Sequence, residues 1–168
     1  DLHKEYRRQR QMCIRDSWTF APMVDIARDA RWGRGIEGVG EDPLLASRFA
    51  AARVRGFQGD DLSHADALLA TPKHFAGYGA AEGGLDYNTV DISERTLREV
   101  YLPPFRAALD AGALSLMSGF HEISGIPSTA NPALLTGVLR GEWGFRGFVV
   151  SDYTCLLYTS PSPRDLST

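Results

Sequence analysis

The carboxylate best placed for chemistry is Asp152, which follows the apolar run Phe148–Val150 with only Ser151 between them. A short β-branched run of this kind is typical of a parallel strand covered on both faces. Because burying an unpaired carboxylate is costly, we expect Asp152 to lie at the end of that strand, where side chains can face a ligand. The alternative is that Asp152 caps the helix that follows.

Three further apolar runs also finish in residues that can donate or accept protons. Those residues are Asp25, the pair Lys73 and His74, and the pair His121 and Glu122. Parallel strands place their carboxyl ends on one face, so polar residues from four separate segments can converge there. The recurrence of the pattern at four successive strand ends favours a single site.

The elements that position these residues alternate between strand and helix. Strands are predicted at 18–25, 65–75, 113–120 and 147–151. The helices between them are expected to begin at Pro43, after the Ser93 cap, and at Pro132, and the first two are expected to end at glycines 56 and 112. In the first helix, Leu45 and Phe49 are expected to face one side. The loops 26–42, 77–91 and 121–130 connect strands to helices. This alternation predicts an α/β fold with parallel strands and crossover helices, either a doubly wound sheet or a barrel.

The two ends of the chain differ in character from its middle. Residues 1–16 are polar and basic without periodicity, and residues 155–168 are rich in Ser and Pro. Both resemble translated sequencing adapters, so we expect them to be non-native flanks around a natural segment at 17–154. Both cysteines, Cys13 and Cys155, fall in these flanks. The natural segment therefore offers no disulfide framework and no thiol nucleophile.

Composition excludes several classes of function. The segment 17–154 carries 12 Lys and Arg against 17 Asp and Glu, which is not the basic footprint of a nucleic-acid protein. No apolar run approaches the length of a membrane span, so no membrane partner is expected. The four histidines lack the close spacing of metal ligands, and the glycine-rich loops lack the features of a phosphate or dinucleotide cradle. We therefore expect no metal and no cofactor, and leave the oligomeric state unknown.

The polar residues at the strand ends suit the recognition of a neutral polyol. Asp, Lys, His and Arg fix sugar hydroxyls through charge-assisted hydrogen bonds, and aromatic rings cover the C–H face of a sugar. A retaining glycosidase also needs a nucleophilic carboxylate and a second acid about 5 to 5.5 Å away. Asp152 can supply the first, and no residue of the chain is evident as the second.

Five segments of the chain, in the same order and at similar spacing, resemble sequences of glycoside hydrolase family 3, most closely its bacterial β-glucosidase and β-xylosidase branch. They are residues 21–43, 71–91, 97–113, 125–145 and 147–153, which include the motifs RWGR, PKHF and SDY. The resemblance implies a fragment of the amino-terminal (β/α) TIM-type barrel domain, with about four parallel strands. It also implies an exo-acting, retaining β-glycosidase of the bacterial periplasm or cytoplasm, whose partner is an oligosaccharide or other β-glycoside. A closed barrel needs about 250 residues, so we expect the fragment itself to be inactive.

The resemblance also assigns roles to residues. Asp152 falls on the catalytic nucleophile. Six residues fall on positions that contact substrate in the family: Lys73, His74, Arg34, Asp86, Phe120 and Tyr153. Many members have Tyr where Phe120 stands, and Trp where Tyr153 stands. The loop after the Lys-His pair lacks the Asp-Ser-His element of the family's N-acetylhexosaminidases, which points to the branch whose acid/base Glu lies in a later segment.

Plainer interpretations compete with several of these roles. Lys73 can be a solvated lysine, His74 a hydrogen-bonded core histidine, and Arg34 a partner of Glu37 or Glu41 in its own loop. Trp32 and Trp143 are expected to pack loops and helix ends. Glu82, His121 and Glu122 receive no role. Two other functions also remain open, a Schiff-base aldolase that uses Lys73 and a non-catalytic carbohydrate-binding domain.

Overall fold

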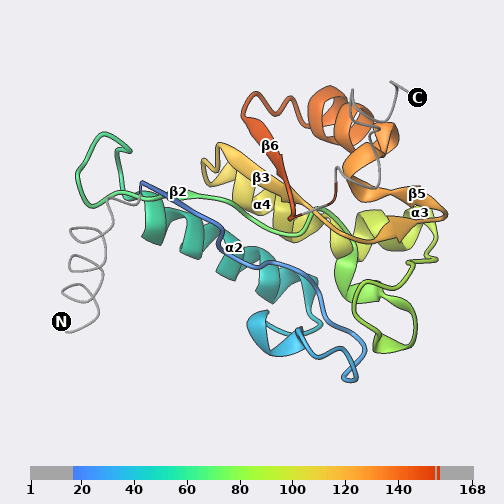
Figure 1. Cartoon of the computed structure of the whole chain (residues 1–168). Helices are drawn as coiled ribbons and strands as arrows, with labels where there is room; N and C mark the ends of the chain where they lie inside the picture. The colour runs from blue at the N-terminus through green and yellow to red at the C-terminus, as the bar shows by residue number, and fades with distance from the viewer. Residues whose placement is uncertain (1–16, 154, 156–168) are drawn as a thin grey trace.

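The computed structural model describes residues 17–153 and 155, so the flanks predicted at 1–16 and 155–168 lie outside the described residues except for Cys155. Four parallel segments form its centre (Figure 1). β1 (Trp18–Thr19) pairs with β2 (Leu69–Ala70), and β3 (Ser115–Ser118) pairs with β6 (Phe148–Ser151). A parallel bridge between Phe75 and Ser118 joins the two pairs. The predicted set of four parallel strands is therefore confirmed.

The first two strands are shorter than predicted. Their regular parts cover two residues each, whereas the sequence suggested eight and eleven. Pro22 and Pro72 interrupt these segments, and proline has no N–H to donate to a neighbouring strand. The segments nevertheless stay paired, because Thr71 N donates to Ala21 O at 2.8 Å and Lys73 N donates to Pro22 O at 3.0 Å.

Helix α2 (Pro43–Gln58) begins where predicted, with the Asp42 side chain accepting a hydrogen bond from Leu45 N at 2.7 Å. It continues through Gly56 and ends before Gly59, which has a φ of 64°. Leu45 and Phe49 share one side of the helix, as predicted, but this side is 45% and 44% exposed at the two residues. The buried face carries Ala46, Ala50, Val54 and Gln58. Most contacts of α2 are with α4, and the small alanines suit close packing between these helices.

The second predicted helix forms in three consecutive pieces, α3 (Glu94–Thr96), η4 (Leu97–Tyr101) and α4 (Pro103–Asp110). Ser93 caps it as expected, accepting from Thr96 N at 3.1 Å. The proline pair opens α4 rather than ending the helical run, because a proline in the first turn loses no helical hydrogen bond. Figure 1 shows α2 and α4 lying alongside the β2 and β3 segments.

The loop predicted at 121–130 contains a small hairpin. β4 (Glu122–Ile123) pairs antiparallel with β5 (Ile126–Pro127), followed by the short helix η5 (Ser128–Ala130). Ser124 and Gly125 form its turn with φ of 51° and 79°, the left-handed conformation that two-residue hairpins need. The helix η6 (Ala133–Glu142) follows and buries Leu134, Val138 and Leu139. Short helices η1 (Gly35–Glu37), η2 (Tyr78–Ala80) and η3 (Glu82–Gly84) lie in the other two long loops.

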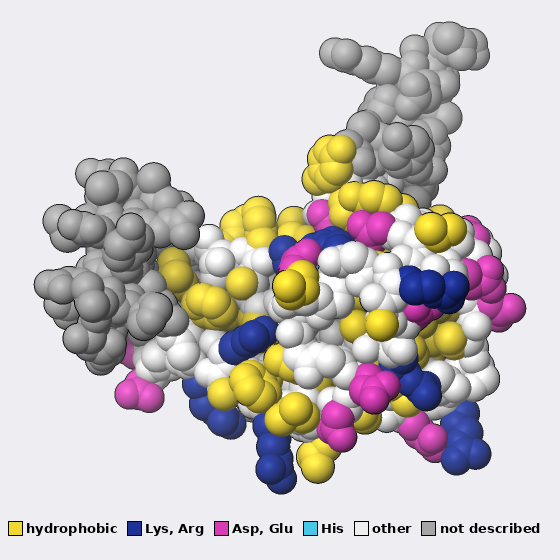
Figure 2. Space-filling model, turned by 90° about the horizontal axis from the view of Figure 1, so that it is seen from below, with side chains coloured by type: hydrophobic (Ala, Val, Ile, Leu, Met, Phe, Trp, Pro, Cys, Tyr) yellow, Lys and Arg dark blue, Asp and Glu magenta, His cyan; other side chains and the backbone are white. Residues whose placement is uncertain are grey.

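One continuous core lies between the strands and the helices. It includes Val54 of α2, Phe105 of α4, Leu116 of β3 and Leu139 of η6, all at most 1% exposed. On the face seen in Figure 2, Lys and Arg side chains are interspersed with Asp and Glu. Within residues 17–153, no helix is long and apolar enough to cross a membrane.

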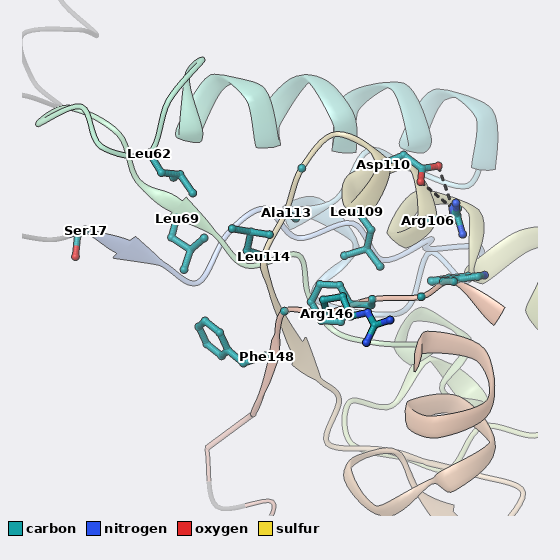
Figure 3. Close-up of a pocket in the computed structure, with 15 residues that line it drawn as sticks. Ser17, Leu62, Leu69, Arg106, Leu109, Asp110, Ala113, Leu114, Arg146 and Phe148 are labelled. Carbon is teal, nitrogen blue, oxygen red and sulfur yellow. Dashed lines mark hydrogen bonds and ion pairs between the residues drawn. The ribbon is translucent and has the colours of Figure 1, made fainter. Parts of the chain in front are cut away.

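A cavity of about 820 Å³ opens at the end of the strands away from Asp152 (Figure 3). Leu69 and Phe148, the first residues of β2 and β6, line it together with Leu109, Leu114 and Phe145. Its lining is mainly apolar and includes none of the polar strand-end residues. The candidate site must therefore be sought at the carboxyl ends of the strands.

The core predicts the effect of truncating Leu116, which is 0% exposed on β3 beside β6. We expect Leu116→Ala to lower the free energy of unfolding by about 2–5 kcal/mol, because it removes apolar contacts and leaves a cavity. Urea unfolding followed by circular dichroism measures the change. Leu114→Ala, at a 49% exposed position two residues away, is the control. Equal losses in the two variants would contradict the described packing.

Candidate active site

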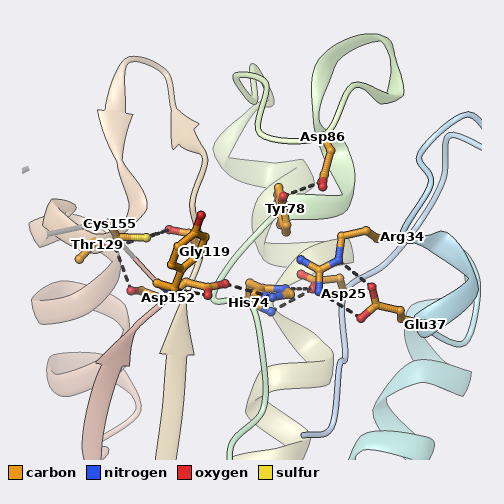
Figure 4. Close-up of polar contacts among 12 residues, drawn as sticks. Asp25, Arg34, Glu37, His74, Tyr78, Asp86, Gly119, Thr129, Asp152 and Cys155 are labelled. Carbon is orange, nitrogen blue, oxygen red and sulfur yellow. Dashed lines mark hydrogen bonds and ion pairs between the residues drawn. The ribbon is translucent and has the colours of Figure 1, made fainter. Parts of the chain in front are cut away.

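The carboxyl ends of three strands meet at His74 (Figure 4). Asp25 follows β1, His74 follows β2, and Asp152 follows β6. The His74 Nδ1 lies 2.8 Å from Asp25 Oδ2, and its Nε2 lies 3.3 Å from Asp152 Oδ2. The imidazole therefore sits between two carboxylates from different strands.

The three side chains differ in their access to solvent. The side chains of Asp25 and His74 are each 1% exposed, whereas that of Asp152 is 15% exposed. Asp152 Oδ1 accepts a hydrogen bond from Tyr153 N at 2.7 Å, which holds the carboxylate at the end of β6. Asp152 is therefore the member of this row that a ligand can reach. The alternative role predicted for Asp152, as the cap of a following helix, concerns a segment that lies outside the described residues apart from Cys155.

Tyr78 joins the remaining predicted residues to this row. Its ring meets the His74 ring edge-on at 5.1 Å, and the guanidinium carbon of Arg34 lies 5.7 Å from its centroid. The Tyr78 hydroxyl donates to Asp86 Oδ1, which also accepts from Trp32 Nε1 at 2.9 Å. Burial, and then the Asp86 carboxylate, raise the pKa of Tyr78, so its hydroxyl keeps its proton.

Aromatic rings form a border that leads back to the carboxylate. Tyr78 faces Tyr87 at 6.5 Å, Tyr87 meets Phe120 at 5.1 Å, and Phe120 meets Tyr153 at 5.8 Å. Tyr153 is 74% exposed and follows Asp152 directly. Phe120 and Tyr153 therefore lie on one rim beside Asp152.

Arg34 forms the local pair that the sequence left as an alternative. Its Nε and a terminal nitrogen donate to Glu37 at 2.7 and 3.0 Å. This bidentate contact raises the pKa of Arg34 and lowers that of Glu37. The positive charge of Lys73 also contributes to the lowered pKa of Glu37. The Lys73 side chain has no hydrogen-bond or ion-pair partner among residues 17–153, and the residue is half-buried.

Two buried residues beside the site, Trp32 and His121, support its aromatic part. Trp32 is 3% exposed and packs with Met23 and Tyr78, which confirms the packing interpretation for this tryptophan. His121 is 1% exposed, stacks on Tyr78 at 5.0 Å, and donates from Nε2 to Ala76 O at 2.8 Å. Its Nδ1 has no partner in the described part of the chain.

Sequence reasoning missed the two residues that connect the site. From the sequence, Asp25 is only an acid at the end of a strand. Because the strands that end at Asp25, His74 and Asp152 are predicted to be parallel, their shared position at the carboxyl ends was a usable signal that they meet. Tyr78 gave no signal, because one tyrosine in a glycine-rich loop does not reveal its burial. Among the described residues, no group of three or more His, Cys, Asp or Glu side chains is arranged to hold a metal ion.

A sequence profile settles the family to which this arrangement belongs. The profile described as the glycosyl hydrolase family 3 N-terminal domain matches residues 8–160. The chain belongs to glycosyl hydrolase family 3. The match runs past 17–154 at both ends, and the assignment of the flanks as non-native stays a prediction. The fold is accordingly part of the TIM-like barrel of this domain, as the sequence predicted.

Known relatives agree with the family. A periplasmic β-glucosidase of Salmonella typhimurium is 47% identical over 135 residues, which cover 80% of this chain and 18% of the relative. A β-xylosidase of Formosa agariphila is 47% identical over 137 residues, covering 79% and 19%. The chain thus spans about a fifth of the length of these relatives. All are glycosidases, so the Schiff-base alternative for Lys73 gains no support.

Solved structures agree as well. The β-glucosidase of Listeria innocua in complex with isofagomine superposes with a TM-score of 0.80 at 47% identity. The superposition covers 83% of this chain and 20% of the Listeria enzyme. An exo-1,3/1,4-β-glucanase of Pseudoalteromonas gives a TM-score of 0.78 at 39% identity, covering 83% and 18%.

His121 predicts how stability of the family 3 segment depends on pH. Burial lowers the pKa of His121 to about 4 in the folded chain, whereas an unfolded histidine titrates near 6.5. The unfolded state therefore binds more protons between these values, and folding loses up to about 3 kcal/mol as the pH falls from about 6.5 to about 4.

Urea unfolding at several pH values measures this loss. His121→Gln is expected to reduce the slope of stability against pH in that range, whereas His64→Gln, at an exposed position, leaves it in place. An unchanged slope in His121→Gln would show that other groups cause the dependence.

Proposed function

We propose that the intact enzyme containing this chain is an exo-acting, retaining β-glycosidase that removes terminal, non-reducing β-linked glucose or xylose. The observation that carries the proposal is the partly exposed Asp152 carboxylate at the end of a barrel strand, 3.3 Å from the buried His74 ring. The relatives support the substrate class, because they are named as β-glucosidases and β-xylosidases. In barrel enzymes, the carboxyl ends of the strands are where catalytic residues lie.

In the proposed reaction, an Asp152 oxygen attacks the anomeric carbon. A glycosyl ester bond forms as the glycosidic C–O bond breaks, and the leaving oxygen takes a proton from a carboxylic acid. Water then hydrolyses the ester with the same acid acting as base, so the configuration is retained. The acid is not Asp25, because that side chain is 1% exposed and the His74 ring lies between it and Asp152. A carboxylic acid from another part of the enzyme must fill this role.

We assign recognition of the sugar to the residues around the row. Lys73 has an ammonium group without a protein partner among residues 17–153, and Arg34 has guanidinium donors beyond the two that Glu37 uses. Asp86 Oδ1 accepts from both Trp32 and Tyr78, which leaves Oδ2 for a sugar hydroxyl. His74 contributes through the edge that faces Asp152. Phe120 and Tyr153 would flank the ring or the leaving group.

Ligands of the neighbouring structures support a glucose-like ring in this site. The Listeria innocua β-glucosidase has been solved in complexes with glucose, isofagomine and laminaribiose. The relatives also include β-xylosidases, so the choice between glucose and xylose depends on residues that contact the hydroxymethyl group.

The nucleophile predicts a large loss of activity in one variant. Asp152→Asn in the intact enzyme is expected to lower kcat for an aryl β-glucoside by at least about 10³-fold, because the amide is a poor nucleophile. Asp110→Asn is the control, since Asp110 pairs with Arg106 on the exposed face of α4. Initial-rate kinetics measure both variants. More than a tenth of the original activity in Asp152→Asn would rule out this nucleophile.

A further inference from the structure

We infer that Asp25 is a positioning residue, which acts through the ring of His74 to fix the orientation of the Asp152 carboxylate. The inference rests on the proposed function, because it assigns Asp152 as the nucleophile. Asp25 itself touches neither substrate nor reacting atoms.

Asp25 holds His74 by two bonds to one oxygen. Asp25 Oδ2 accepts from the His74 backbone N at 2.9 Å and lies 2.8 Å from Nδ1 of the same residue. The first bond fixes the backbone at the end of the β2 segment, and the second fixes the rotation of the ring. Together they leave Nε2 facing Asp152 Oδ2 at 3.3 Å.

In the described part of the chain, the Asp25 carboxylate makes hydrogen bonds only with His74. Its Oδ1 is buried and makes no hydrogen bond among residues 17–153. An uncompensated buried carboxylate is strongly unfavourable, so the His74 ring is the group that compensates it. A hydrogen on Nδ1 is thereby required, and a second hydrogen on Nε2 would be donated to Asp152.

Other charged or titratable groups near His74 are placed differently. The rings of Tyr78 and His74 meet edge-on at 5.1 Å, and a Cβ added at Gly119 would lie 2.5 Å from the His121 ring and 3.5 Å from the Cβ of His74. Glu37 is paired with Arg34, and the charge of Lys73 acts on Glu37. Only Asp25 and Asp152 meet the nitrogens of His74 within 3.5 Å in the described chain.

Burial and a backbone hydrogen bond restrict the positions of the two segments that carry Asp25 and His74. Val24 is 2% exposed beside Asp25, and its backbone N donates to Lys73 O at 2.9 Å, so the residues before Asp25 and His74 are joined. The arrangement is similar to one in which a buried acid orients a histidine that contacts a neighbouring nucleophile. For Asp152, the result is one oxygen held by His74 and the other by Tyr153 N.

The test is the intact enzyme carrying Asp25→Asn. We expect kcat for an aryl β-glucoside to fall about 10- to 100-fold, the range seen when residues that orient a functional histidine are changed. Affinity for isofagomine, measured by titration calorimetry, should change less than about threefold, because Asp25 does not touch the ligand. Calorimetry also counts the folded sites against which kcat is expressed. Val24→Ala is the matched control, expected to reduce stability while keeping kcat per site.

A double-variant cycle tests the route through His74. If Asp25 acts through this ring, adding Asp25→Asn to His74→Gln should have little further effect on kcat. Independent, multiplicative losses would overturn the inference, as would a normal kcat per site in Asp25→Asn.

A measurement on the unsubstituted enzyme covers the case in which Asp25→Asn fails to fold. Selective ¹⁵N labelling of histidine should show a hydrogen on His74 Nδ1. A His74 ring protonated only on Nε2 would overturn the inference. This measurement does not depend on catalysis, so it also separates failure of the inference from failure of the proposed function, which Asp152→Asn tests.

Discussion

The contact between the buried Asp25 carboxylate and the His74 ring is the constraint on which the rest of the site depends. It joins the ends of two strand segments, and the other nitrogen of the same ring reaches the end of a third strand at Asp152. A buried carboxylate needs a partner that is always present, whereas a substrate is present only part of the time. The protein meets this need internally and leaves Asp152 accessible.

The surroundings of this row divide into a structural part and an open part. Tyr78, Trp32 and His121 are nearly fully buried and support one another through ring contacts and hydrogen bonds. Arg34, Lys73, Asp86 and Tyr153 lie outside them and are more exposed. This division suits the proposed site, in which the nucleophile is held in place and exposed polar groups can reach sugar hydroxyls. The lining of the apolar cavity at the opposite end of the strands includes none of these polar residues.

Much of the fold was predictable because the strand-to-helix alternation and the capping residues are local signals. The helices begin where the sequence predicts, and in the structure Asp42, Ser93 and Asn131 cap them. The exposed face of α2 was not predictable from residue size, because close packing against α4 favours alanine over leucine. The hairpin at β4 and β5 was missed because its turn uses Ser124 rather than the usual asparagine or aspartate before glycine.

The polar strand ends were predictable in position but not in partnership. Sequence order indicated that Asp25, His74 and Asp152 end parallel strands, yet only the three-dimensional register shows which nitrogen meets which carboxylate. The pairing of Arg34 with Glu37 was one of two local options, and the sequence gave no reason to choose between Glu37 and Glu41. Tyr78 could not be predicted, since its role arises entirely from tertiary burial.

Direct trapping of the intermediate is the most decisive measurement. The intact enzyme, treated with a 2-deoxy-2-fluoro glycosyl donor that slows hydrolysis of the ester, should gain the mass of one fluorosugar. After proteolysis, peptide mass spectrometry should place that sugar on Asp152, within the sequence GFVVSDY. A label on a different carboxylate, or turnover of the donor with inverted configuration, would contradict the account.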